Sequence, residues 1–246
     1  KNSLKSIYDK YLNNPDISIV DKRFITEIVN GTIRMFKRID YYISEYYKGR
    51  IDNLEKLYLI ILRISVYQLK YMNKVPSYAA VSTAVEITKI FFPKYSKLSN
   101  ALLRKISRKP SELNLPNKQS SIDYLSIYYS HPEWLINKWS AKYSYNSLVS
   151  LLEFNNKTPR TWFRYNKNKI NILDIEKELE KYKVDLKINN ILENFFNIKN
   201  ASLLLKSQLF KNGKIHVQNP TNGLIVKLLN PLKGEKIVDA CAAPGG

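Results

Sequence analysis

The stretch from Leu54 to Met72 is apolar on almost every side when it is drawn as a helix. Its apolar positions leave no polar stripe: Leu57, Leu59, Ile60, Ile61, Leu62, Ile64, Val66 and Leu69. A helix without a polar face has to be surrounded by other elements. The stretch therefore predicts an all-helical domain built around one central helix.

The segments on either side have the three- and four-residue apolar spacing of amphipathic helices. We expect one helix from about Asp21, its N-cap, to Tyr47, and two more over residues 77–92 and 96–108. Gly31 lies inside the first of these, where glycine costs about 1 kcal/mol relative to alanine. We interpret it as a point of close helix packing.

Residues 110–130 are predicted to be a linker. The part from Lys109 to Ser121 is rich in proline, serine and asparagine and has no aromatic residue. His131-Pro132-Glu133-Trp134 then begins a helical pair, with proline early and glutamate in the first turn. The first domain is accordingly assigned to residues 1–109.

After Thr158 the apolar period shortens. Strands are expected at residues 160–165, 184–188 and 215–218, and helices at residues 172–182, 201–209 and 221–229. We assign residues 131–215 to the helical pair plus a small α+β module similar to an RRM. Residues 216–246 are assigned to the beginning of a further domain, whose parallel sheet starts with a strand at Ile237–Ala240. The fold class is therefore mainly α.

The charge balance points to a polyanionic partner. The chain has 40 Lys and Arg against 21 Asp and Glu, a net charge of +19, and both halves are basic. An alternative is that a composition rich in Lys, Asn, Ile and Tyr reflects an AT-rich genome, with the charge serving only solubility. A single cysteine suits a reducing cytoplasm.

Other classes of protein are disfavoured. No apolar run reaches the ~18 residues that span a bilayer, so no membrane association is expected. His131 and His216 lack metal-ligand spacing, and we interpret both as structural residues in a chain without a metal. The chain does not begin with Met and stops inside a motif, so we expect it to be truncated. Separately, we expect the protein to be a monomer.

That final motif is Asp239-Ala240-Cys241-Ala242-Ala243-Pro244-Gly245-Gly246, a strand end that runs into a glycine turn. Glycine lets the backbone approach a ligand closely because it has no side chain. The same pattern occurs in many nucleotide-binding sheets. The interpretation as an ordinary strand-to-turn junction therefore stays open for the aspartate and glycines alone.

The complete motif resembles the S-adenosylmethionine site of RNA cytosine-C5 methyltransferases. Five earlier segments resemble the RsmB/Sun family of 16S rRNA methyltransferases in order and spacing: residues 21–34, 63–69, 75–86, 100–106 and 131–135. Asn219 and Asn222-Gly223 depart from the family pattern near the cofactor entry. The resemblance implies a NusB-like N-terminal RNA-binding domain and a truncated, Rossmann-like methyltransferase domain.

The resemblance also implies the chemistry. A cysteine thiolate adds to C6 of cytosine, C5 then takes the methyl group of S-adenosylmethionine, and loss of the C5 proton expels the thiolate. The nucleophilic cysteine is expected downstream of Gly246, so no catalytic residue lies in this chain and the chain alone should be inactive. Contacts to the cofactor are expected from Cys241, Ala242, Ala243, Pro244, Gly245 and Gly246.

RNA contacts are expected from basic helix faces, where Lys and Arg can neutralise phosphates. Two clusters are predicted, one of Lys22, Arg23, Arg34, Lys37 and Arg38, the other of Arg104, Lys105 and Arg108. Trp162, Phe163 and Tyr165 could stack on bases, although at least one should point into the core. The function expected is 5-methylcytosine formation in 16S rRNA. The alternative is a non-catalytic NusB-type antitermination factor.

Overall fold

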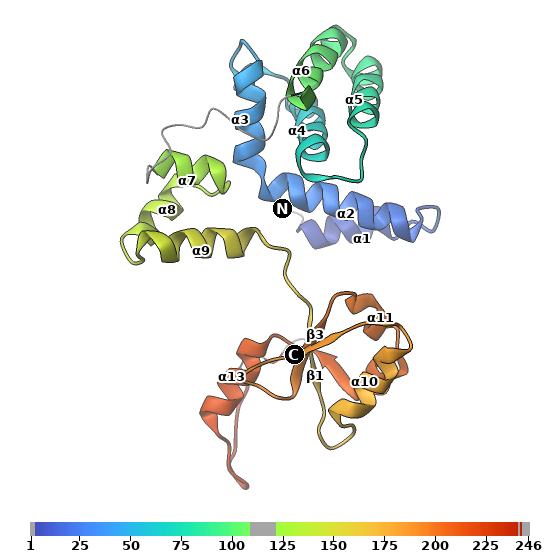
Figure 1. The fold of residues 1–246 in the computed structure, drawn as a ribbon, viewed down its shortest axis with the longest axis vertical. Helices are drawn as coiled ribbons and strands as arrows, with labels where there is room; N and C mark the ends of the chain where they lie inside the picture. Colours follow the sequence, from blue (N-terminus) through green and yellow to red (C-terminus); the bar gives the residue numbers. More distant parts are fainter. Residues whose placement is uncertain (1–2, 109–121, 241, 243–246) are drawn as a thin grey trace. The chain divides into compact units, whose positions relative to one another are not determined.

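The computed structural model describes residues 3–108, 122–240 and 242 (Figure 1). The chain divides into two compact units, Lys1–Lys157 and Thr158–Gly246. The first is built of helices and the second combines a small sheet with short helices, so the expected mainly α fold with a small α+β module is confirmed.

The first unit begins with α1 (Leu4–Leu12), α2 (Ile19–Arg34) and α3 (Phe36–Tyr46). After the short η1 (Ile51–Asn53), it continues with α4 (Lys56–Tyr71), α5 (Ser77–Phe91), η2 (Pro93–Tyr95) and α6 (Ser96–Arg108). The later helices are α7 (Ile122–Tyr128), α8 (Glu133–Ser140) and α9 (Tyr145–Asn156).

Helix α4 is the predicted central helix. It contacts α2, α3, α5 and α6, and Leu59, Leu62 and Val66 are buried among them. Its first turns are less enclosed than the sequence suggests, since Leu57 and Ile60 remain exposed. Tyr58 in the first turn is nevertheless buried, so the core of the unit follows one face of α4 along its length.

The single helix expected from Asp21 to Tyr47 is two helices. Met35 leaves helical geometry, with φ −98° and ψ 18°, between α2 and α3. This break lets both helices pack against α4. The helix also begins earlier than predicted, because Ser18 is its N-cap and accepts a hydrogen bond from the Asp21 N–H at 3.1 Å.

Gly31 is the close-packing point that the sequence predicted. It is buried on α2, and a Cβ atom at this position would collide with the ring of Tyr67 on α4. The Tyr67 hydroxyl donates to Glu27 Oε1, one turn earlier on α2, at 2.7 Å. Burial raises the pKa of Tyr67, and its hydrogen bond to the Glu27 carboxylate raises this pKa further. Tyr67 therefore remains a neutral donor that fixes α2 on α4.

A second tie joins α3 to α4. The Arg63 guanidinium donates to both carboxylate oxygens of Asp40, at 2.6 and 2.8 Å, and lies 4.0 Å from the centre of the Phe36 ring. Both charged side chains are more than four-fifths shielded from solvent, at 16% and 18% exposure. Because both groups are charged and the contact is bidentate, its hydrogen bonds are stronger than those between neutral groups.

Part of the predicted linker is structured. Residues 122–128 form α7, whose Leu125 packs in a small core with Ile136 of α8 and Leu148 and Leu152 of α9. Helix α7 also contacts α3. The aromatic and apolar residues after Ser121 supply this core, while Lys109–Ser121 lies outside the described residues.

The second unit contains β1 (Trp162–Tyr165), α10 (Ile172–Glu180), β2 (Leu186–Ile188), β3 (Phe195–Ile198), α11 (Ala201–Leu205), α12 (Gln208–Lys211), β4 (Ile215–Val217) and α13 (Pro220–Leu229). The sheet is antiparallel with the order β2-β3-β1-β4. A β-α-β-β-α-β chain in this order is the ferredoxin-like arrangement. Figure 1 shows α10 and α11 on one side of the strands and α13 on the other.

Four expectations for this unit need correction. Strand β3 was not predicted, although it lies second in the sheet and is buried throughout. The helix expected over residues 201–209 is split into α11 and α12. Residues 216 and 217 belong to β4, which pairs with β1, and so belong to the small sheet. Ile237–Ala240 forms no strand, because the described residues offer this segment no partner strand.

The Gly31→Ala variant should unfold more easily, by about 1–3 kcal/mol, because the added methyl group overpacks the Tyr67 ring. Urea denaturation followed by circular dichroism measures this loss. In a Tyr67→Leu background the same alanine should cost nothing, since the ring is gone. An equal loss in both backgrounds would contradict the proposed collision.

The Arg63→Met variant should lose about 1.5–3 kcal/mol, because Asp40 stays shielded without its charged donor. Arg50→Ala is the matched control. Arg50 and Asp52 are 3.8 Å apart and both are largely exposed, so that pair should contribute less than about 1 kcal/mol. Similar losses of unfolding free energy for the two variants in urea denaturation would show that the Arg63–Asp40 pair stabilises the fold no more than an exposed ion pair does.

Candidate nucleic-acid interface

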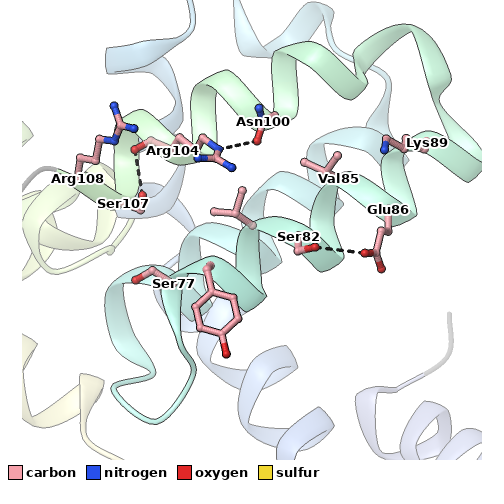
Figure 2. A pocket seen from close by; sticks show the side chains of 11 residues that line it. Ser77, Ser82, Val85, Glu86, Lys89, Asn100, Arg104, Ser107 and Arg108 are labelled. Atoms are coloured by element: carbon pink, nitrogen blue, oxygen red, sulfur yellow. Dashed lines mark hydrogen bonds between the residues drawn. The ribbon is translucent and has the colours of Figure 1, made fainter.

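A cleft of about 320 Å³ lies between α5 and α6 (Figure 2). Its wall on α5 carries Ser77, Tyr78, Val81, Ser82, Val85, Glu86 and Lys89, and its wall on α6 carries Asn100, Arg104, Ser107 and Arg108. Two of the arginines predicted to bind RNA, Arg104 and Arg108, are therefore brought together here.

The burial pattern of α6 turns these arginines outward. Leu102, Leu103 and Ile106 are buried in the core, so Arg104 and Arg108, four residues apart, share the exposed face. Lys105 is exposed on the same helix but does not line the cleft.

A buried chain of hydroxyl groups fixes the helices behind the cleft. The Tyr58 and Ser99 hydroxyls are hydrogen-bonded at 3.0 Å, and Ser99 donates to Thr88 Oγ1 at 3.3 Å. Thr88 in turn donates to the carbonyl of Ala84 at 2.7 Å. The chain connects α4, α6 and α5, so the spacing of the cleft walls is set by satisfied buried polar groups.

The cleft is positively charged and has hydrogen-bonding groups at its rim. Arg104 Nε donates to Asn100 Oδ1 at 2.8 Å, which orients the guanidinium, while Ser82 donates to Glu86 Oε1 at 3.2 Å. Arg104, Arg108 and Lys89 outnumber the single carboxylate of Glu86. Such a set suits phosphate groups, which Arg and Lys bind through charge-assisted hydrogen bonds.

The sequence did not point to Lys89, Asn100 or Tyr78 as part of this site. Tyr78 is 79% exposed at the cleft, where its ring can stack on a base. The signal that could have identified them is the outward face of the predicted helix over residues 77–92, where Tyr78, Ser82, Glu86 and Lys89 recur at three- and four-residue steps.

The predicted cluster on α2 is less open than expected. Lys22 and Arg34 are half-buried and Arg23 is exposed. Two residues that share their face are engaged by neighbouring helices, since Glu27 accepts from Tyr67 and Asn30 accepts from the Tyr8 hydroxyl at 3.1 Å. Part of this face is therefore engaged by residues of α1 and α4.

Lys37 and Arg38 connect α3 to the helices that follow. Lys37 Nζ donates to Glu133 Oε1 at 3.0 Å and to the Ser126 hydroxyl. Arg38 lies 4.4 Å from the centre of the Tyr128 ring and donates to the Tyr128 carbonyl at 3.3 Å. These contacts give both side chains a structural role, so we leave them out of the proposed RNA surface.

The predicted aromatic strand divides between the two faces of the sheet. Phe163 and Tyr165 are buried in the core with Phe196, whereas Trp162 lies on the opposite face and is partly exposed.

His131 Nδ1 is 2.6 Å from the Tyr129 carbonyl, at the start of the helical pair, and His216 lies on β4.

Of the six residues predicted to contact a cofactor, only Ala242 lies within the described residues; Cys241, Ala243, Pro244, Gly245 and Gly246 lie outside them. Ile237 and Val238, which lead to them, are 52% and 88% exposed. The described residues therefore form no cradle that fits S-adenosylmethionine, and we derive no step through it.

Within residues 3–108, 122–240 and 242, no three His, Cys, Asp or Glu side chains are grouped so that they could hold a metal ion. Over the same ranges, no helix has the length and apolar character needed to cross a bilayer.

Comparison with known proteins gives relatives for both units. Probable ribosomal RNA small subunit methyltransferase B of Bacillus subtilis is 26% identical over 246 residues, which are 99% of this chain and 53% of that protein. The protein of the same name from Synechocystis is 29% identical over 97% of this chain and 54% of its own length. The chain thus spans about half the length of these relatives.

Among solved structures, PH0851 superposes with a TM-score of 0.67 over 100% of this chain and 55% of its own chain, at 23% identity. This likeness concerns the fold. Two family models each match one part of the sequence. Residues 1–108 match the NusB family, and residues 131–202 match the ferredoxin-like domain described as RsmF/B-like methyltransferase. The chain therefore has one region similar to the NusB family, followed by one similar to the RsmF/B-like ferredoxin-like domain.

Proposed function

We propose that this chain is the RNA-recognition part of an S-adenosylmethionine-dependent methyltransferase that forms 5-methylcytosine in 16S rRNA. The observation that carries the proposal is the combination of the basic α5/α6 cleft with the two domain matches in one chain. The names of the relatives support a ribosomal RNA substrate and a methyl donor. The net charge of +19 supports a polyanionic partner.

In this proposal the cofactor site begins at Cys241 and is completed by sequence beyond Gly246. Helix α13 and the residues after it expose Ile225, Leu228, Leu229 and Leu232. A Rossmann-like domain would cover such apolar side chains, which supports the assignment of residues 216–246, apart from β4, to its beginning. The nucleophilic thiol would come from that domain, so the chain by itself should bind RNA and transfer no methyl group.

A non-catalytic NusB-type factor accounts for less of the chain. It would explain the first domain, but it gives no reason for an RsmF/B-like ferredoxin-like domain or for the motif that follows. We therefore favour the methyltransferase.

Methyl transfer tests the proposal directly. The complete protein should transfer tritiated methyl groups from S-adenosylmethionine to 16S rRNA that lacks this modification, and nucleoside analysis should identify the product as 5-methylcytosine. The chain of 246 residues should transfer none. A Cys241→Ala substitution in the complete protein should leave the covalent step intact, because Cys241 is assigned to cofactor contact.

Methylation of another base would overturn the cytosine-C5 assignment, and transfer by the chain alone would overturn the proposed division of labour. Failure of the complete protein to bind S-adenosylmethionine in calorimetry would reject the cofactor.

The α5/α6 cleft is tested separately by RNA binding. Arg104→Ala/Arg108→Ala should weaken binding to a 16S rRNA transcript by about 10-fold near 0.1 M salt. It should also reduce the slope of log affinity against log salt by about 1.4, since two phosphate contacts are lost. Fluorescence anisotropy over a salt series measures both quantities.

Lys48→Ala/Arg50→Ala is the matched control for this variant. Both residues are exposed in the same unit, and neither lines the cleft, so the variant loses equal charge elsewhere. Equal effects of the two variants would mean that net charge, and not the cleft, determines binding.

A further inference from the structure

A cleft of about 670 Å³ lies in the second unit at the β2 edge of the sheet, where β2 begins and β3 ends. Three segments line it: residues 158–161 before β1, residues 183–187 at the start of β2, and residues 197–199 at the end of β3. Residues 158–187 and 197–199 all belong to this one unit. Nothing in the function proposed so far uses this cleft.

The lining is strongly cationic. Arg160, Lys183, Lys187 and Lys199 are exposed around it, against the single acid Asp185. Within the part of the chain that the structure describes, none of these four cationic groups has an ion-pair or side-chain hydrogen-bond partner. The mutual repulsion of four such charges is relieved when an anion binds between them.

Other lysines of the same unit differ in this respect. Lys167 pairs with Glu193 at 3.4 Å, Lys181 pairs with Glu178 at 2.6 Å, and Lys227 donates to the Ile191 carbonyl at 3.2 Å. The four cations at the cleft differ from these three lysines, because Arg160, Lys183, Lys187 and Lys199 lie together around one cleft and have no such partner among the described residues. One lysine on an edge strand can serve to discourage strand addition. That role does not explain Arg160, Lys183 or Lys199, which lie outside the strand.

The register of the sheet adds an aromatic ring to this charge. Lys187 on β2 is paired with Asn197 on β3, and Asn197 is paired with Trp162 on β1. Paired residues point to the same side of a sheet, and this side is opposite to the core that contains Phe163 and Phe196. A cation, a buried amide and a partly exposed indole thus form one row about 10 Å long, at the usual strand spacing.

Helix α13 covers a different part of the same side. A Cβ atom on Gly223 would collide with the ring of Phe195, so α13 packs directly on the first residue of β3, two positions before Asn197. The row from Lys187 to Trp162 is left beside the cleft. Cations for a phosphate backbone next to a ring for a base match the pattern by which proteins bind single-stranded nucleic acid.

We propose that the β2-edge cleft is a second RNA-binding site, in which Arg160, Lys183, Lys187 and Lys199 hold the backbone of single-stranded RNA and Trp162 stacks on a base. This proposal rests on the proposed function, because it takes RNA to be the partner of the chain. The site shares no residue with the α5/α6 cleft.

The test uses the whole chain and a fluorescent 12-nucleotide oligouridylate. Lys183→Gln/Lys187→Gln/Lys199→Gln should reduce the salt slope of binding by about 2, since three phosphate contacts at 0.7 each are lost. Affinity near 0.1 M salt should fall at least 10-fold. Lys167→Gln/Lys181→Gln/Lys227→Gln removes the same charge from the same unit and should change both quantities much less.

Stacking is tested by a separate variant. Trp162→Leu should weaken oligouridylate binding about 5-fold or more, with the salt slope unchanged, because a stacked base carries no counterion term. Circular dichroism of each variant confirms that the unit is folded. Where Trp162→Leu fails to fold, quenching of tryptophan fluorescence by the oligonucleotide in a Trp134→Phe/Trp139→Phe background gives the same information.

The proposal is overturned if the test and control triple variants lose affinity equally, or if duplex RNA or an acidic peptide competes as well as the single strand. The proposed function fails differently. A chain that binds no RNA at all refutes both, whereas RNA binding that depends on Arg104 and Arg108 but not on the β2-edge lysines refutes only this site.

Discussion

The first unit depends on the close approach of two helices where one residue has no side chain. Gly31 lets the Tyr67 ring of α4 pack closely against α2, and the Tyr67 hydroxyl then reaches Glu27. The break at Met35 lets α3 pack on a further part of α4, where Asp40 meets Arg63. The remaining helices complete the enclosure of an apolar helix that could not be stable alone.

The basic residues of the chain divide into those that hold the fold and those that face solvent. Lys37, Arg38 and Arg63 each contact groups on another helix, so their charges are partly used within the domain. Arg104, Arg108 and the cations of the β2 edge have exposed charged groups at the rims of clefts. A high net charge alone does not distinguish these roles, because it counts both kinds of residue equally.

The features of the fold that could be predicted from the sequence are those set by residues close together in the chain. Helical periodicity and the apolar run of α4 are local properties, so the helical regions and the close packing at Gly31 were predicted correctly, whereas two of the helices proved to be divided. Strand β3 was missed because Phe195 and Phe196 lie among asparagines, which are uncommon in strands, and because both of its faces are covered. The break at Met35 and the partners of Lys37 depend on distant residues, which apolar spacing does not reveal.

The two clefts show that functional residues from different segments also could not be grouped from the sequence alone. Arg104 and Arg108 were identified because they are neighbours on one helix, whereas Lys89 and Tyr78 join them only after α5 packs on α6. The β2-edge residues come from three segments up to about forty positions apart, and none forms a motif in the sequence.

The pairing of Lys187, Asn197 and Trp162 has a consequence for how this module can change in evolution. Neighbouring side chains on a strand alternate between the two faces of a sheet, so one inserted residue in β2 or β3 would turn the lysine or the amide toward the phenylalanine core. Length changes in these strands are therefore tolerated only in pairs of residues, or when they are absorbed in the turns. The chemistry of the surface is in this way tied to the parity of the strand lengths.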